Sequence, residues 1–461
     1  MTTRSKNGSG AGVDFQIEGK AATRAIVLHV DRRDRSAPPT SDRAVEARLE
    51  EAVGLALAID LEVEAAIVAP VTAPKPATLL GSGKVAEIAE VVKETEAELV
   101  VVNAQLSPIQ QRNLEKEWGA KVLDRTGLIL EIFGRRASTR EGTLQVELAH
   151  LQYQKSRLVR SWTHLERQRG GFGFLGGPGE SQLEADRRLI QERISRIEGQ
   201  LESVKKTRAL HRKGRARVPY PVVALVGYTN AGKSTLFNRL SGAEVLAKDL
   251  LFATLDPTMR VIQLPHGRKI ILSDTVGFIS DLPTSLIAAF RATLEEVLSA
   301  DIILHVRDIA HDDSEAQAED VNRVLEELGI DELRRSKIIE VWNKLDLLPP
   351  EERTAREAQA LRKPGCVLVS AVTGEGLGPL LELVEGRLGA DDTIYEVMLG
   401  PEDGQGQAWL HDRGEVLSRH NYTDGRIRMK VRLTTDKAGQ AQAKFGTAMK
   451  LLGQKKKVAA E

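Results

Sequence analysis

The feature that most constrains the fold is a Gly-rich turn between an apolar run and a helical pattern, in the segment VVALVGYTNAGKSTLFNRL (residues 222–240). Residues Gly227 to Ser234 fit G-x-x-x-x-G-K-[S/T], which binds phosphate where a strand precedes it and a helix follows. Backbone N–H groups and the helix dipole attract the anion. Lys233 would approach the β- and γ-phosphates, and the Ser234 hydroxyl would ligate Mg²⁺. The segment therefore predicts a parallel α/β domain with a nucleotide phosphate site.

Three short motifs follow in chain order, each at the end of a predicted strand, and they predict that the base is guanine. The segment from Asp274 to Gly277 would hold Mg²⁺ through water and sense the γ-phosphate. In the NKLD segment, residues 343–346, the Asp346 carboxylate can accept from the guanine N1–H and exocyclic amine, a donor pair that adenine lacks. The backbone of Ser370 and Ala371 could donate to guanine O6. NKxD alone can be a strand-end turn, but the ordered set predicts a GTP-binding domain.

Two details of this site bear on hydrolysis. The segment KDLLFATLDPTMR (248–260) lies where a switch would cover Mg²⁺, and Thr254 is favoured as the ligand over the alternative, Thr258. Phe278 stands where many small GTPases carry a glutamine that orients the attacking water. A phenyl ring cannot hydrogen-bond to water, so the backbone, another residue or a partner must position it. We therefore expect slow intrinsic hydrolysis that a partner accelerates, by up to ~10³–10⁵-fold.

The region before this domain alternates strand-like runs such as RAIVLHV with helical patterns such as SPIQQRNLEKEW. This alternation predicts a small parallel α/β domain over residues 22–137. Gly81 to Lys84 imitates the end of a phosphate loop but lacks the earlier glycine and the following Ser or Thr. We expect it to begin a helix instead.

Residues 138–210 contain the Gly-rich segment GGFGFLGGPGESQLEADRRLI (170–190). On each side of its glycines, apolar residues recur alternately four and three positions apart, which forms two apolar stripes. Such stripes predict an antiparallel helical hairpin, each arm projecting roughly 30 Å at ~1.5 Å per residue. The G-x-G-x-x-G pattern in the turn follows a polar helix, whereas a dinucleotide site requires a strand before it. Aromatic residues in the turn and arginines on the arms suit insertion into structured RNA, and a plain flexible turn is the alternative of equal weight. The candidate RNA contacts are Arg169, Gly171, Phe172, Gly173, Phe174, Leu175 and Gly176.

Composition excludes several classes of protein. The 65 Lys and Arg residues balance 65 Asp and Glu residues, so a polyanion must be met by local patches. The single cysteine, Cys366, excludes an internal disulfide and fits a reducing compartment; it is expected on a buried strand. No apolar run approaches the ~18 residues of a membrane span, and the first residues lack the core of a signal peptide. We expect a cytoplasmic monomer, with peripheral membrane association of part of the population as an alternative.

The remaining boundaries complete a chain of α/β units. The expected fold is a P-loop GTPase domain preceded by a small parallel α/β domain with the long antiparallel hairpin, and followed by a small C-terminal α/β domain. The other expected segments are a disordered tail at 1–21, a basic linker at 211–217, the GTPase domain at 218–390, the C-terminal domain at 391–436 and a C-terminal helix and tail at 437–461.

In these features the chain resembles the HflX family, in the Obg-related branch of translation-factor GTPases. The resemblance covers about residues 22–389 and rests on LSPIQQRNLEKEW, VLDRTGLILEIF, RASTREGTLQVELAHLQY, GGFGFLGGPGESQLEADRR, FATLDPT and DTVGFI. It implies binding to the large ribosomal subunit and its rRNA, with the hairpin tip as the contact. It also implies splitting of stalled or idle ribosomes under stress, with hydrolysis permitting release. A large-subunit assembly GTPase and an ATP-dependent rRNA-remodelling activity of the N-terminal region remain the alternatives.

The motifs and the resemblance together imply a set of site residues. The implied GTP contacts are Gly227, Tyr228, Thr229, Asn230, Ala231, Gly232, Lys233, Ser234, Thr235, Phe252, Ala253, Thr254, Asp274, Thr275, Val276, Gly277, Asn343, Lys344, Leu345, Asp346, Ser370, Ala371 and Val372. The implied Mg²⁺ ligands are Ser234 and Thr254. No catalytic residue is assigned, and the candidates are Asp274, Gly277 and Phe278. Phe278 in place of glutamine is usual in this family.

Overall fold

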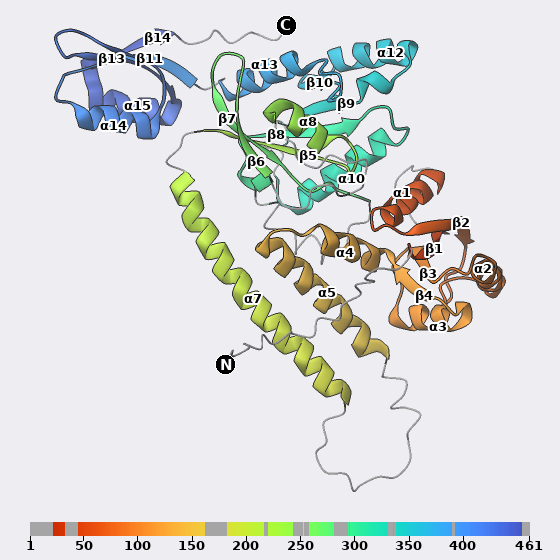
Figure 1. The fold of residues 1–461 in the computed structure, drawn as a ribbon. Coiled ribbons are helices and arrows are strands. Elements are labelled where there is room, and N and C mark those ends of the chain that lie inside the picture. Colours follow the sequence, from red (N-terminus) through yellow and green to blue (C-terminus); the bar gives the residue numbers. More distant parts are fainter. Residues whose placement is uncertain are drawn as a thin grey trace, which may run out of the picture.

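The structure is a computed structural model that describes residues 22–32, 45–161, 182–215, 220–242, 252, 258–280, 294, 296–330, 335, 338–389 and 392–453. In this part of the chain three sheets follow one another, and a pair of long helices lies between the first and the second in sequence (Figure 1). No helix among the described residues is long and apolar enough to cross a membrane.

The first sheet forms the predicted parallel α/β domain. Its elements are β1 (Arg24–Arg32), α1 (Val45–Leu57), β2 (Glu62–Val71), α2 (Ser82–Thr95), β3 (Leu99–Asn103), α3 (Pro108–Trp118) and β4 (Lys121–Asp124). The strands are parallel in the order β2-β1-β3-β4. The centre of β1 is continuously buried, as expected where helices cover both faces of a parallel sheet. Helix α2 begins directly after Gly81, so the Gly81 to Lys84 segment starts a helix as predicted.

Helix α4 (Arg125–Arg136) follows β4 without a loop, at a place where no helix was predicted. The carboxylate of Asp124 caps it by accepting from the Gly127 N–H at 2.8 Å. Most of the helix is buried, and its Phe133 ring meets the Phe252 ring of the next domain edge-on at 4.7 Å between centroids. Helix α4 therefore packs against the GTPase domain as well as against its own sheet (Figure 1).

The predicted hairpin consists of α5 (Arg140–Ser161) and α7 (Gln182–Arg215). The helices are antiparallel: Leu144 packs with Ile197 and Leu201, while Lys155, further along α5, donates to Gln191. The turn, residues 162–181, and all the candidate RNA contacts lie outside the described residues. Helix α7 continues to Arg215, so the linker expected at 211–217 is helical over its first five residues. This run, HRKGR, combines strong helix formers, Arg and Lys, with the weaker His211 and Gly214, so intrinsic propensity alone does not mark it as helical.

The second sheet is the core of the predicted GTPase domain (Figure 1). Its elements are β5 (Val222–Gly227), α8 (Lys233–Ser241), β6 (Thr258–Gln263), β7 (Lys269–Asp274), β8 (Ile302–Asp308), α10 (Ser314–Glu327), β9 (Ile339–Asn343), α12 (Pro350–Leu361), β10 (Cys366–Leu368) and α13 (Leu377–Leu388). The order is β10-β9-β8-β5-β7-β6, parallel except for the edge strand β6.

Three polar side chains of this sheet lie at buried or half-buried positions. His305 is buried on β8. Arg307 is buried on the same strand, where it forms ion pairs with Glu340 at 3.1 Å and Glu315 at 2.7 Å. Cys366 was expected to be buried but is half-buried; burial still raises the pKa of its thiol to about 12, which keeps it protonated.

The third sheet forms the C-terminal unit. Its elements are β11 (Asp392–Leu399), α14 (Gly404–Arg413), β12 (Glu415–Asn421), β13 (Ile427–Thr434), α15 (Thr435–Phe445) and β14 (Met449–Gly453). The sheet is antiparallel in the order β12-β13-β11-β14, and both helices lie on one face (Figure 1). The boundary expected at 436 is too early, because β14 pairs with the central strand β11. A five-residue strand after a polar helix carries too little alternation to be read from sequence.

Candidate nucleotide-binding site

The predicted motifs meet at one edge of the second sheet. Strands β5, β7, β8 and β9 run parallel, and their carboxyl ends carry Gly227, Asp274, Asp308 and Asn343. In open α/β sheets, ligands bind outside the carboxyl ends of the strands. The structure therefore brings the P-loop, defined as residues 227–234, together with the second and third motifs at the place where a nucleotide would be expected.

The backbone of the P-loop requires glycine at two points. Gly232 has φ +88°, and a Cβ there would lie 2.2 Å from Asn343 Nδ2. Gly227 has φ +153°, and a Cβ there would lie 2.2 Å from the Val306 carbonyl oxygen. A side chain at either point would displace the loop from the neighbouring strands, so the close approach of backbone to ligand site depends on both glycines.

Lys233 is a buried cation at the N-terminus of α8. Its side chain is enclosed, and its Nζ donates to the Tyr228 carbonyl oxygen at 2.7 Å. Burial lowers the pKa of the Lys233 ammonium to about 8, against the opposing effect of Asp274. An anion would stabilise both the buried charge and the N-terminus of the helix. These surroundings suit a phosphate group.

Ser234 and Asp274 provide hard oxygen donors beside this lysine. The Ser234 hydroxyl donates to Asp274 Oδ2 at 2.7 Å, and the Asp274 carboxylate is buried. A hydroxyl and a carboxylate next to a phosphate site are the donors that Mg²⁺ prefers. The pair therefore fits the ion implied by the sequence. Thr254, the other expected ligand, lies outside the described residues, and the alternative Thr258 begins β6 opposite Asp274.

The segment after Asp274 lies directly on the P-loop. A Cβ added to Gly277 would lie 2.8 Å from Thr229 Cγ2 and 3.0 Å from Lys233 Nζ. The Phe278 carbonyl accepts from the Thr229 N–H at 2.7 Å. The Phe278 ring is buried in the apolar cluster that contains Phe252 and offers no polar group to a water molecule. We call residues 274–280, which include this ring, the switch.

The third and fourth motifs are joined by hydrogen bonds of Asn343. Its amide donates to the Ala231 carbonyl at 2.9 Å and accepts from the Ala371 N–H at 3.0 Å, which ties the P-loop to the loop after β10. The Ser370 hydroxyl donates to Asp346 Oδ1 at 2.6 Å and holds that carboxylate in place. This arrangement can present the Asp346 carboxylate to the donor edge of a purine. The N–H groups of Ser370 and Ala371, which were predicted to donate to guanine O6, instead donate to the Glu375 carbonyl at 3.0 Å and to Asn343.

Asp308 supports this part of the site and was missed from the sequence. The Asp308 carboxylate forms an ion pair with Lys344, at 2.7 Å between Oδ2 and Nζ. Lys344 adopts a left-handed backbone with φ +68°. The signal was present, since Asp308 ends a buried strand next to the one that ends at Asn343. The position of Asp308 beside the NKLD segment follows from the pairing of β8 with β9, which could not be predicted from the sequence.

Comparison with known proteins identifies the family. Four family models match in order: "GTP-binding GTPase N-terminal" at 46–134, "GTP-binding GTPase Middle Region" at 136–215, "50S ribosome-binding GTPase" at 222–344 and "HflX C-terminal domain" at 355–455. The GTPase HflX of Magnetococcus marinus is 52% identical over 398 residues, covering 86% of this chain and 90% of that protein. The chain belongs to the HflX family of GTPases.

A second relative supports the same assignment. The GTPase HflX of Escherichia coli K12 is 45% identical over 414 residues, covering 90% of this chain and 94% of that protein. The predicted family is thus confirmed, and with it the α/β fold class and the identity of the chain as a GTP hydrolase of a ribosome-associated family. The roles of individual residues toward GTP, Mg²⁺ and RNA stay predictions.

Proposed function

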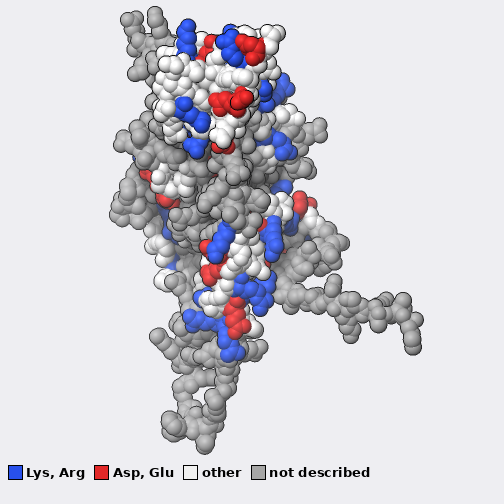
Figure 2. Space-filling view, turned by 90° about the vertical axis from the view of Figure 1, so that its left-hand side faces the viewer, with Lys and Arg blue, Asp and Glu red and all other residues white. Residues whose placement is uncertain are grey.

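We propose that this HflX-family GTPase binds the rRNA of the large ribosomal subunit through its hairpin and separates stalled or idle ribosomes under stress, with GTP hydrolysis permitting its release. The observation that supports this most is the shape and charge of the hairpin. Helices α5 and α7 extend away from the GTPase domain (Figure 1). On α7, Arg187, Arg188 and Arg196 are exposed, and Figure 2 shows blue side chains over this arm with red ones between them.

Local charge matters here because the chain as a whole carries no formal net charge. Exposed arginines on a projecting arm can neutralise phosphates without drawing the rest of the surface to RNA. Structured RNA is recognised through its shape, its phosphates and its unstacked bases, which a narrow helical arm with an aromatic tip can reach. The expected tip contacts, Arg169 and Gly171 to Gly176, continue this arm in sequence.

At the nucleotide site, we propose that the P-loop holds the phosphates of GTP and that Asp346 selects guanine. Ser234 and Thr254 would hold Mg²⁺, with Asp274 beside it. The ion would neutralise charge that develops on the phosphates during transfer. Lys233 would bind the same phosphates, and the Gly277 N–H would contact the γ-phosphate. Since the Phe278 ring cannot orient water, a bound partner would complete the arrangement.

The proposal is tested by GTP hydrolysis at fixed enzyme, with and without purified large subunits. We expect strong stimulation of the intact protein and none of a variant lacking Phe172 to Gly177. A matched pair separates local charge from general effects: Arg196→Glu on α7 should weaken subunit binding, and Arg362→Glu directly after α12, which is also exposed, should not. Absence of stimulation of the intact protein by the subunit would overturn the ribosome proposal while leaving the GTP site in place.

Two further measurements address the alternatives. An assembly GTPase would bind immature large subunits and leave joined ribosomes intact, which sedimentation distinguishes. An ATP-dependent remodelling activity would continue when excess GTP competes for the nucleotide site. We also propose that the protein is a cytoplasmic monomer, which sedimentation of the purified chain and cell fractionation would check.

A further inference from the structure

A buried ion pair joins the N-terminal domain to the switch that follows Asp274. Arg125, the first residue of α4, donates to Glu51 Oε1 of α1 at 2.6 Å, and both side chains are only 6% exposed. The same guanidinium donates to the Ser280 carbonyl oxygen at 2.7 Å and to its hydroxyl oxygen at 3.0 Å. Ser280 lies two residues after Phe278, so a residue of the first domain holds the switch backbone.

The P-loop takes part in the same contact. The Tyr228 hydroxyl donates to Glu51 Oε2 and accepts from the Ser280 N–H, the latter at 2.7 Å. The Ser280 hydroxyl donates to Glu51 Oε1 at 3.0 Å. We call Glu51, Arg125, Tyr228 and Ser280 the interdomain cluster. Its hydrogen bonds connect the P-loop and the switch to each other and to the first domain.

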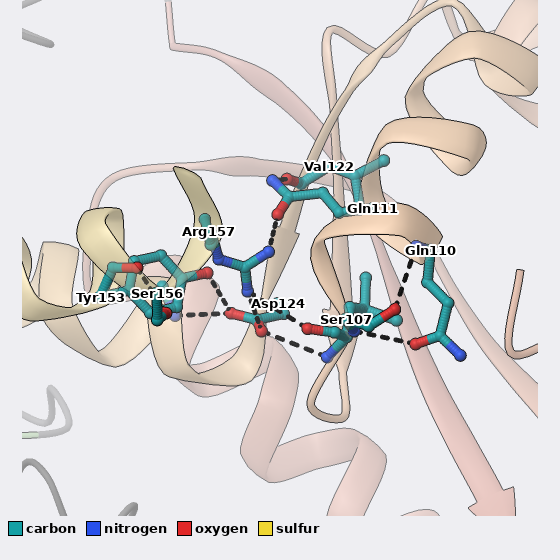
Figure 3. A network of polar contacts seen from close by, with 10 residues as sticks. Ser107, Gln110, Gln111, Val122, Asp124, Tyr153, Ser156 and Arg157 are labelled. Carbon is teal, nitrogen blue, oxygen red and sulfur yellow. Dashed lines mark hydrogen bonds and ion pairs between the residues drawn. The ribbon is translucent and has the colours of Figure 1, made fainter. Parts of the chain in front are cut away.

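The residue before Arg125 holds the hairpin. Asp124, which is 2% exposed, accepts from the Tyr153 hydroxyl at 2.6 Å and from Arg157 Nη2 at 2.5 Å. Tyr153 and Arg157 both lie on α5, and Figure 3 shows them pointing at the Asp124 carboxylate from the hairpin side. Burial, and then the charge of Asp124, raises the pKa of the Tyr153 hydroxyl well above its usual value, so it remains a donor.

The first domain also forms hydrogen bonds to Asp124, from the side opposite the hairpin. The carboxylate accepts from the Leu106 N–H at 3.2 Å and from the Gly127 N–H at 2.8 Å. Arg157 also donates to Gln111 of α3, which in turn donates to the Val122 carbonyl at 2.7 Å (Figure 3). The arm α5 is thus bonded to the strand-to-helix junction itself, with no flexible loop between them.

Consecutive residues of one rigid junction therefore bind the hairpin and the switch. Hydrogen bonds to buried charges are costly to break because little water can replace them. A shift of α5 that keeps its bonds to Asp124 must move the start of α4, and with it the Arg125 backbone. Arg125 in turn is hydrogen-bonded to Ser280. Ser280 follows Gly277, which lies against Lys233.

We propose that Asp124 and Arg125 relay the position of the hairpin arm to Ser280, and that Glu51 and Arg125 are positioning residues for GTP hydrolysis. They act through the backbone of Gly277 and Phe278, which the interdomain cluster holds against the P-loop. The Phe278 side chain cannot position the attacking water. Through this relay, a partner bound to the hairpin could instead set the geometry of the switch backbone. This proposal rests on the proposed function in one respect only, namely that RNA binding at the hairpin moves the arm.

The first test replaces the buried pair by apolar side chains of similar length, Glu51→Met together with Arg125→Met in the full chain. Removing both charges leaves neither buried without a partner, so the fold is retained. We expect subunit and GDP affinities within about threefold of the parent, and subunit-stimulated kcat reduced at least about tenfold. The matched control is Arg24→Met with Glu96→Met, an exposed pair of the same domain, which should change none of these values. Full stimulation of the buried-pair variant would overturn the proposal.

The second test does not depend on the ribosome. In Arg157→Met, Asp124 loses its charged hairpin partner while the N-terminal domain and the GTPase domain keep all of their own residues. We expect hydrogen exchange of the Ser280 amide to become several-fold faster, while amides in the centre of β8 stay unchanged. Unchanged exchange at Ser280 would overturn the relay. If the parent protein shows no stimulation by large subunits, the proposed function fails, and the exchange result still decides the relay.

Discussion

At the scale of single residues, Lys233 couples nucleotide binding to pH. Burial lowers the pKa of its ammonium to about 8, and a bound triphosphate would raise that pKa again. The protein then takes up a proton on binding GTP near pH 8. The affinity for GTP should be highest below pH 8. It should fall as the pH rises from 8 towards the higher pKa that Lys233 has in the complex.

Calorimetry in two buffers of different ionisation enthalpy measures this proton uptake. Lys233→Met should bind GTP much more weakly, show no uptake, and melt without nucleotide at least as high as the parent, because a buried charge has been removed. Equal proton uptake in the parent and in Lys233→Met would show that another group is responsible.

Asp346 should determine the choice of base. Asp346→Asn replaces a carboxylate oxygen by an amide that can donate, and guanine presents only donors at this edge. We expect GTP affinity to fall by about a hundredfold or more, since a site built for these hydrogen bonds loses them. Xanthosine triphosphate, whose carbonyl at position 2 can accept from the new amide, should bind more tightly to the variant than to the parent. Competition binding with both nucleotides measures the ratio, and an unchanged ratio would contradict the role of Asp346.

These residues could be predicted because parallel strands bring their carboxyl ends to one edge, so chain order translates into proximity. Asn343 was predictable in this way, and its bonds to Ala231 and Ala371 explain its position. Glu51 and Arg125 were not predictable, because charged residues usually face solvent. Their burial depends on Tyr228 and Ser280, which lie far away in sequence.

At the scale of elements, the start of α4 should be the most sensitive point of the first domain. Asp124→Ala leaves the N–H groups of Leu106 and Gly127 without their acceptor and Arg157 without its partner. Removing one partner of a buried charge pair costs about 3–5 kcal/mol of unfolding free energy. Glu87→Ala on α2, which affects only the exposed pair with Lys84, should cost less than about 1 kcal/mol. Urea unfolding compares them, and similar losses would contradict this account.

Most helices and strands were predictable from periodicity, and the exceptions have physical reasons. The first turns of helix α4 are buried on all sides, so this part of its segment lacks the polar face that marks a helix in sequence. Strand β14 is placed by pairing with β11, a contact between distant segments. The extension of α7 to Arg215 was not predicted, because the run HRKGR was interpreted as part of a linker from its charge and contains Gly214, a weak helix former.

At the scale of the whole molecule, the first domain, the hairpin and the GTPase domain meet around α4. The apolar cluster that contains Phe133 also contains Phe252 and Phe278, so the packing of the switch depends on the first domain. Family membership could be predicted from the sequence because its motifs span most of the chain. The contact between the domains could not, since it depends on how two separately folded sheets pack together.

The central claim is that GTP-bound protein separates ribosomes into subunits. The most direct measurement is sedimentation of joined ribosomes after incubation with this protein and GTP, beside Lys233→Met and the variant lacking Phe172 to Gly177. We predict that the parent protein converts joined ribosomes to free subunits and that both variants leave them joined. Intact ribosomes in all three samples, with the parent protein bound only to free large subunits, would contradict the claim and favour a role in subunit assembly.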